Sequence, residues 1–176
     1  FYPNFYRIAD RNMFDAIGWD FPASPADVAP PQPEPMTFSS NPTALSTSSI
    51  TMTATIATDA TNPVQYFFEE TTVGPGGTTS GWQTPNSYVD AGLNANTLYA
   101  YRVKARDAVL PTPNENTFSE IEDAATLIQT PGGIAFFNVT NDSAQVTATG
   151  TFTNLNAGMS GIYFDVSPPG AYGNAF

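Results

Sequence analysis

The chain of 176 residues contains no cysteine and no histidine. Without cysteine it forms neither disulfide bonds nor thiolate metal sites. Without histidine, thiol–imidazole catalysis, the Ser-His-Asp arrangement and histidine-ligated zinc are excluded within this chain. A glycosidase needs two carboxylates that face each other, whereas the adjacent residues Glu69 and Glu70 would point to opposite sides of a strand. We therefore predict that the chain is not an enzyme.

Basic residues are also scarce, since five Lys and Arg stand against sixteen Asp and Glu, for a net charge of −11. Nucleic acid is not an expected partner, because phosphate binding needs a basic patch. Three of the basic residues, Arg102, Lys104 and Arg106, share one face of a predicted strand, and we expect acidic partners for them on the neighbouring strand. No apolar run approaches the roughly 20 residues that span a bilayer.

The clearest pattern that is present is the alternation of residues in Leu98–Arg106. Tyr99, Tyr101 and Val103 fall on one face and basic residues on the other, which is the period of a half-buried antiparallel strand. Together with Leu93 and the turn after it, this run resembles strands E and F of a fibronectin type III domain. The resemblance implies that Leu93, Tyr99, Tyr101 and Val103 are structural residues, and that the Tyr99 hydroxyl bonds to backbone just after Leu93.

Residues 36–128 are predicted to form a complete domain of seven short strands. The expected strands are Met36–Phe38, Ser49–Ala57, Val64–Glu70, a short one at Trp82, Tyr88–Ala91, Thr97–Arg106 and Phe118–Leu127. Alternation predicts Ile50, Met52, Ala54, Ile56, Val64, Tyr66 and Phe68 as core residues. The core tryptophan usual on the second strand of the family is absent, and we expect Trp82 or Phe118 to fill its volume.

Residues 129–176 resemble the beginning of a second copy of this domain. Ser143, Thr147, Ala148 and Thr149 repeat Ser49, Thr53, Ala54 and Thr55 at a constant offset. The copy lacks its last strands, so we expect its apolar residues to need a partner, either another copy of the chain or a neighbouring domain. The predicted fold class is all-β: an Ig-like or fibronectin type III-like antiparallel sandwich in one complete copy plus a partial second copy.

Two further segments precede the sandwich. Residues 1–22 are predicted to contain a short helix that begins after Asp10 and ends at Gly18. Residues 10–20 resemble the closing helix of metzincin-like secreted zinc peptidase domains, which implies a natural protein that continues upstream of Phe1. Residues 23–35 are rich in proline and are predicted to form an extended linker.

Ligand and modification sites are suggested by only a few residues. Asp107, Glu115 and Glu120 could supply the oxygen atoms that calcium requires, and no other cofactor is expected. Asn138 and Asn141 each begin an Asn-x-Ser/Thr tripeptide and are glycosylation candidates. The aromatic residues considered for carbohydrate binding are Trp82, Tyr88, Tyr172 and Phe176.

The sequence thus favours a non-catalytic module at the cell surface or outside the cell, of the bacterial secreted type. Low charge and many Thr, Ser and Asn side chains suit such a location, and the repeat suits a surface array, an adhesin or a filament. The alternative interpretation is a C-terminal accessory region of a larger secreted hydrolase such as a zinc peptidase. An upstream zinc-binding motif in the complete gene would favour that alternative.

Overall fold

The computed structural model describes residues 26–155 and 161–164 of the chain. The helix expected in residues 1–22, the metzincin-like stretch 10–20, Tyr172 and Phe176 lie outside these residues. Within the described part, all helical or strand structure is β strand. The predicted all-β class with antiparallel pairing is therefore confirmed, while the number of domain copies stays a prediction.

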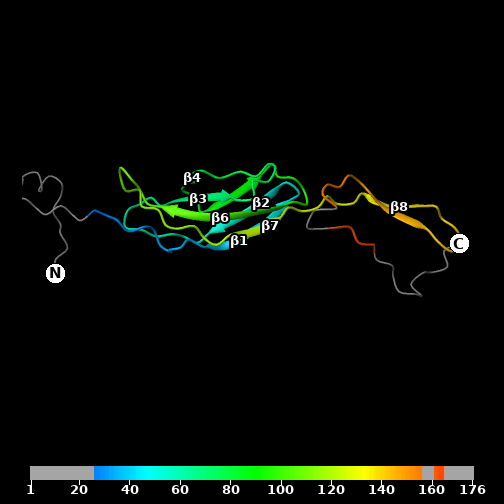
Figure 1. The fold of residues 1–176 in the computed structure, drawn as a ribbon, viewed down its shortest axis with the longest axis horizontal. Coiled ribbons are helices and arrows are strands. Elements are labelled where there is room, and N and C mark those ends of the chain that lie inside the picture. Colours follow the sequence, from blue (N-terminus) through cyan, green and yellow to red (C-terminus); the bar gives the residue numbers. More distant parts are fainter. Residues whose placement is uncertain (1–25, 156–160, 165–176) are drawn as a thin grey trace, which may run out of the picture.

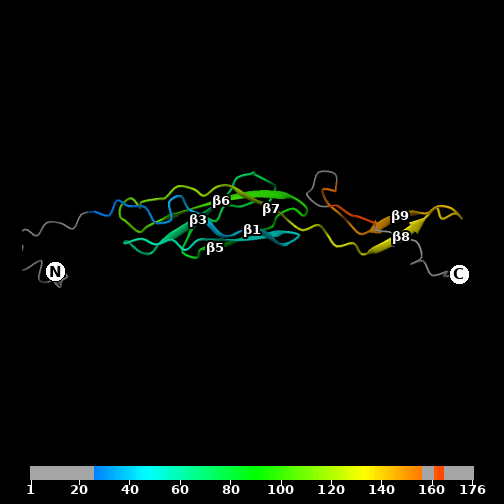
Figure 2. The same ribbon diagram turned by 90° about the horizontal axis from the view of Figure 1, so that it is seen from below.

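In the described part of the chain, nine strands form three antiparallel sheets. The strands are β1 (Phe38–Ser46), β2 (Ser49–Ala54), β3 (Gln65–Glu70), β4 (Trp82–Gln83), β5 (Ser87–Ala91), β6 (Leu98–Arg106), β7 (Glu122–Ala125), β8 (Gly133–Phe137) and β9 (Gln145–Thr149). Their order is β1-β2-β5 in one sheet, β4-β3-β6-β7 in the second and β8-β9 in the third. The first two sheets face each other in one elongated unit, which we call the first unit. The β8–β9 hairpin lies beyond one end of it (Figures 1 and 2).

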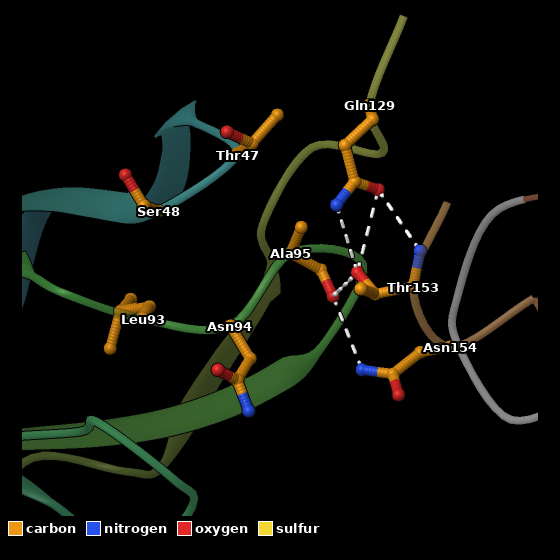
Figure 3. A pocket seen from close by; sticks show the side chains of 8 residues that line it. All are labelled: Thr47, Ser48, Leu93, Asn94, Ala95, Gln129, Thr153 and Asn154. Atoms are coloured by element: carbon orange, nitrogen blue, oxygen red, sulfur yellow. Dashed lines mark hydrogen bonds between the residues drawn. The ribbon is translucent and has the colours of Figure 1, made fainter. Parts of the chain in front are cut away.

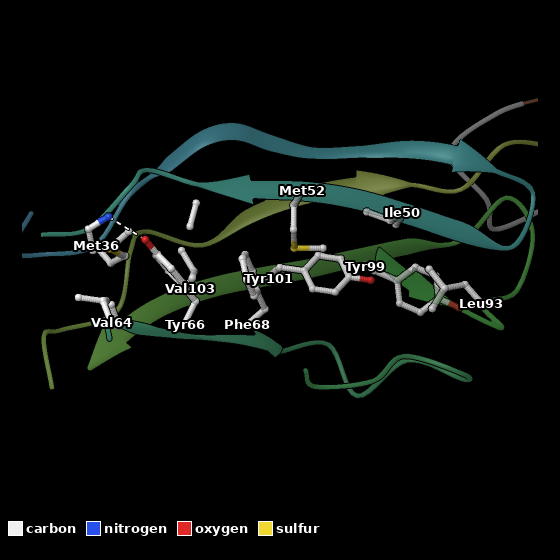
Figure 4. Close-up of a cluster of buried hydrophobic side chains, with 13 residues drawn as sticks. Met36, Ile50, Met52, Val64, Tyr66, Phe68, Leu93, Tyr99, Tyr101 and Val103 are labelled. Carbon is white, nitrogen blue, oxygen red and sulfur yellow. Dashed lines mark hydrogen bonds between the residues drawn. The ribbon is translucent and has the colours of Figure 1, made fainter. Parts of the chain in front are cut away.

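The core of this first unit lies between its two sheets (Figure 4). On β6, Tyr99, Tyr101 and Val103 have no exposed surface, whereas the basic residues between them face outward. Ile50 and Met52 of β2 meet these side chains from the opposite sheet. The alternation of apolar and polar residues therefore places one face of each strand in a shared core, as half-buried antiparallel strands require.

The first strand differs from the sequence prediction. It runs from Phe38 to Ser46 and not over residues 36–38, and Met36 precedes it as a buried residue of the irregular segment. The strand contains Pro42 and many small polar residues, which read as a loop. Because β1 lies at the edge of its sheet and its register shifts on both sides of residue 42, the missing donor of proline is tolerated there.

Two expectations about the core are wrong. Ile56 is 73% exposed, because β2 ends at Ala54 and the alternation ends with it. Trp82 and Phe118 do not fill the core, because they pack around Phe67 on the outer face of the second sheet. The core is filled instead by Phe68, which contacts aromatic rings of the opposite sheet.

The described part of the predicted linker lies against the first unit. Gln32 forms a backbone bridge with Thr58, and Pro31 is buried. Asn116, only 4% exposed, donates from its amide to the carbonyl oxygen of Pro33 at 2.9 Å. These bonds fix the extended, proline-rich segment against the first unit.

The hydroxyl of Tyr99 is held at the turn that precedes its strand. It accepts a hydrogen bond from the backbone N–H of Asn94 at 2.9 Å and donates one to the carbonyl oxygen of Pro75 at 2.7 Å. A Cβ atom at Gly74 would lie 2.8 Å from the Tyr99 ring, so glycine is required for this close approach. Tyr99 thus joins two loops at one end of the core.

Replacing Tyr99 by phenylalanine tests these two bonds. The ring packing is kept, while the N–H of Asn94 and the carbonyl of Pro75 lose their partner. We expect Tyr99→Phe to lower the free energy of unfolding by about 1–2 kcal/mol in urea denaturation. Tyr163→Phe is the control, since that side chain is 85% exposed. Equal stability of the two variants would contradict the role of the Tyr99 hydroxyl.

Candidate functional site

A buried carboxylate lies next to the centre of the core. Asp90 on β5 has no exposed surface and accepts hydrogen bonds from the Tyr101 hydroxyl at 3.0 Å and from the backbone N–H and hydroxyl of Thr78 at 3.0 and 2.5 Å. Burial raises the pKa of Tyr101 above its usual range, and the negative charge of Asp90 raises it further. A carboxylate that is closed off and fully hydrogen-bonded in this way joins the two sheets and has no access to a substrate.

The raised pKa of Tyr101 predicts a loss of stability in alkali. In the unfolded chain a tyrosine ionises near its ordinary value of 10.0, whereas the folded state keeps the Tyr101 proton to higher pH. The stability is therefore complete below pH 10 and decreases as the pH rises above it. Urea denaturation at a series of pH values should show this decrease, and Tyr101→Phe should reduce its slope. An unchanged slope in the variant would contradict the prediction.

Three carboxylates gather at the end of the first unit where the described part of the chain begins. Asp27, Asp59 and Asp107 each offer an oxygen atom, and these atoms lie within 4.8 Å of one another. Asp107 is 1% exposed and accepts bonds from Asn114, and the hydroxyl of Thr61 donates to Asp27 at 2.5 Å. The bond from Thr61, followed by one from a backbone N–H, lowers the pKa of Asp27.

This cluster differs from the calcium site expected from the sequence. Asp107 is part of it, but Glu115 forms an ion pair with Lys104 at 2.6 Å, and Glu120 is exposed and lies outside the cluster. Asp27 and Asp59 were missed because they come from the linker and from a loop, and no sequence spacing connects them. The oxygen atoms are of the type that calcium takes. Calcium binding at Asp107 stays a prediction.

The outer face of the second sheet carries all three basic residues of the described part of the chain. Arg102 lies 4.0 Å from the Phe118 ring centre, Arg106 lies 4.3 Å from that of Trp82, and Lys104 lies between them. Arg102 pairs with Glu69 on the neighbouring strand, as expected. The cations lie over the aromatic rings, and these cation–π contacts stabilise the outer face of the sheet.

The aromatic residues considered for carbohydrate binding are thus engaged within the chain where the structure describes them. Trp82 lies beneath Lys104 and Arg106. Tyr88 stacks on Phe68 with ring centres 5.6 Å apart, and its hydroxyl bonds to that of Thr78 at 2.7 Å. Both side chains are partly buried and have ring contacts within the chain, and carbohydrate binding stays a prediction.

An open pocket of about 400 Å³ marks the junction between the first unit and the hairpin (Figure 3). It is lined by uncharged side chains: Thr47, Ser48, Leu93, Asn94, Ala95, Gln129, Thr153 and Asn154. Gln129 and Thr153 bond to each other, with the Gln129 amide donating to the Thr153 hydroxyl at 3.0 Å. The side chain of Asn154 donates to the carbonyl of Ala95 at 3.2 Å.

A second pair of bonds strengthens this junction. Asn154 donates to the hydroxyl of Thr97 at 2.6 Å, and the amide of Asn96 donates to the carbonyl oxygen of Asn154 at 3.2 Å. Both asparagines have positive φ angles of about 50–57°, which asparagine tolerates better than most residues. The junction is therefore a specific, neutral contact between loops that lie more than 50 residues apart in the sequence.

The two glycosylation candidates lie on the hairpin. Asn138 directly follows β8, and its amide donates to the side-chain oxygen of Gln145 at 2.6 Å. Asn141 lies in the connection between β8 and β9. Both are exposed. Modification at either position stays a prediction.

Comparisons with known proteins add a likeness of fold at low similarity. No family model matches the sequence, and no curated protein matches it. Among solved structures, the two-domain fibronectin type III segment from chicken tenascin superposes with a TM-score of 0.39 and 15% identity, over 70% of this chain and 63% of that segment. This chain therefore covers less than two thirds of the tenascin segment, and at this similarity the likeness assigns neither family nor function.

Proposed function

We propose that this chain is a non-catalytic extracellular structural module with a fibronectin type III-like sandwich followed by a partial second copy. Its role is to hold partners apart and in line within a surface array, an adhesin or a filament. The observation that supports this most directly is the junction, where loops of two β units are hydrogen-bonded side by side and the units follow each other along one axis (Figures 1 and 3).

The polar groups of the first unit support the same role. Asp90, Asn116 and Tyr99 are buried and each bonds to a loop or strand distant in sequence. Buried polar networks of this kind fix one arrangement of loops and strands. In the described residues, every buried side-chain nitrogen and oxygen atom has a hydrogen-bond partner. The buried polar side chains of the first unit thus serve to hold its loops and strands rigid.

The location outside the cell is supported by composition. The charged share of 12% is low, and the exposed strand faces carry Thr, Ser and Asn. In the described part of the chain, no helix has the length and apolar character needed to cross a membrane.

Surface labelling tests the proposed role. Antibodies raised against the chain should label intact cells of the source organism by immunogold microscopy, in arrays or fibres, while a cytosolic marker stays unlabelled. Label that appears only after permeabilisation would overturn the proposal. Label confined to a secreted protein that also contains an upstream zinc-binding motif would instead support the accessory role in a hydrolase.

A further inference from the structure

Near its turn, the β8–β9 hairpin has the same register as the β1–β2 hairpin of the first unit. With the offset of 94 residues seen in the sequence, the pair Phe137–Gln145 corresponds to Thr43–Thr51, and both pairs are direct partners across their hairpins. The first unit can therefore be used as an internal template. It shows what a hairpin of this register buries, and what covers it.

Equivalent positions differ sharply in burial. Met52 is 1% exposed, whereas its counterpart Val146 is 38% exposed. Pro42 is buried, whereas its counterpart Phe136 is 68% exposed. Ile134 pairs with Ala148, and Phe136 pairs with Val146, so these four side chains share one face of the hairpin. Ile134 on this face is 60% exposed. We call Ile134, Phe136, Val146 and Ala148 the open face.

The template also indicates the chemistry of the missing cover. In the first unit, the sheet that contains β3 and β6 covers β2 with large side chains, among them Phe68 and Tyr101. Residues 161–164 do not supply such a strand, since no strand is formed there and Tyr163 is 85% exposed. The cover must therefore be a segment rich in large apolar and aromatic residues.

The first 22 residues of the chain have this composition. Their large apolar residues are Phe1, Tyr2, Phe5, Tyr6, Ile8, Met13, Phe14, Ile17, Trp19 and Phe21. The described part of the chain begins, in blue, at the end of the first unit opposite the β8–β9 hairpin (Figure 1). A segment at one end and a receiving surface at the other end suit a head-to-tail contact between two copies, which repeats without closing.

The distribution of charge favours the same contact. Residues 26–128 carry eleven acidic and three basic side chains, so two copies of the first unit repel each other. Residues 129–176 carry only two acidic side chains, and residues 1–22 carry three acidic and two basic ones. Contact between the N-terminal segment of one copy and the hairpin of another thus meets less repulsion than contact between two first units.

We propose that the open face of the β8–β9 hairpin is covered by residues 1–22 of a second copy of this chain, so that copies assemble head to tail. This inference rests on the proposed structural role and names the partner that completes it. Covering the face removes Ile134, Phe136 and Val146 from water, and this burial stabilises the contact between copies.

Complementation between two full-length variants tests the proposal. Phe136→Asp damages the open face, and the triple variant Phe5→Asp, Phe14→Asp, Ile17→Asp damages the N-terminal segment. By sedimentation velocity, the wild-type chain should form oligomers that grow with concentration. Each variant alone should associate about tenfold or more weakly. Mixed, the two should form a one-to-one complex, because each supplies the surface that the other lacks.

A control variant and two contradicting outcomes complete the test of head-to-tail assembly. Leu110→Asp places a charge at an 87% exposed position of the first unit and should assemble like the wild type. A wild-type chain that stays monomeric at all concentrations overturns the inference. Association of the triple variant alone that is as strong as that of the wild type also overturns it, because it would indicate contact between two open faces. Surface labelling decides the proposed function separately, so a surface protein that stays monomeric would overturn only this inference.

Discussion

Phe68→Ala is expected to lower the free energy of unfolding by about 3–5 kcal/mol, the usual range for removing a buried aromatic ring. Phe68 has no exposed surface and lies between the sheets, with its ring centre 5.6 Å from that of Tyr88 and 6.4 Å from that of Phe38. Truncation of the side chain leaves a cavity. The neighbouring strands cannot close it, because backbone hydrogen bonds between strands hold them in place. Urea denaturation of the two proteins measures the difference.

Ile56→Ala is the matched control for this prediction. The alternation in the sequence predicts Ile56 as a core residue like Ile50 and Met52 of β2, but 73% of its surface is exposed in the structure. The substitution should change stability by less than about 0.5 kcal/mol. A large loss at Ile56, or a loss below about 2 kcal/mol at Phe68, would contradict the position of the core.

Asp90→Ala is expected to destabilise the protein by about 3 kcal/mol. The substitution leaves the buried Tyr101 hydroxyl without its acceptor, which costs about 1–3 kcal/mol, and it also removes the two bonds that exposed Thr78 donates to Asp90. The measurement is again urea denaturation near neutral pH. Asp123→Ala, an exposed acidic residue on β7, should be nearly neutral.

A double-mutant cycle separates the bond from the loss of packing. Tyr101→Phe alone should cost about 1–2 kcal/mol, because it removes one hydrogen bond and keeps the ring. The double variant Asp90→Ala, Tyr101→Phe should lose less than the sum of the single variants, since the unsatisfied hydroxyl is gone. Strict additivity would show that the two side chains do not interact.

The regular strands could be predicted from the sequence because one face of each strand contacts the core and the other face contacts solvent. On β6, the core and the solvent impose a strict alternation, and the strand follows it from Leu98 to Arg106. The edge strand β1 was missed over most of its length because small polar residues and Pro42 give no such pattern. An edge strand is paired on one side only, so its sequence is less constrained.

The candidate sites were less accessible, because they depend on contacts between distant residues. Of the three clustered carboxylates, only Asp107 was among the predicted calcium candidates, and the fold brings Asp27 and Asp59 to it. In the same way, Trp82 was assigned to the core because it is large and apolar. Its position opposite Phe67 on the outer face follows from the pairing of β3 with β4, which one-dimensional patterns do not contain.

By itself, the sequence determined the all-β class and the inward face of the central strands, because strand periodicity is a local property. Only the tertiary structure decided that Asp90 lies beneath Tyr101, that Asn154 contacts Ala95, and that the β8–β9 hairpin presents an open face. These features depend on which surfaces meet in space, and burial of an apolar side chain is settled by what packs against it.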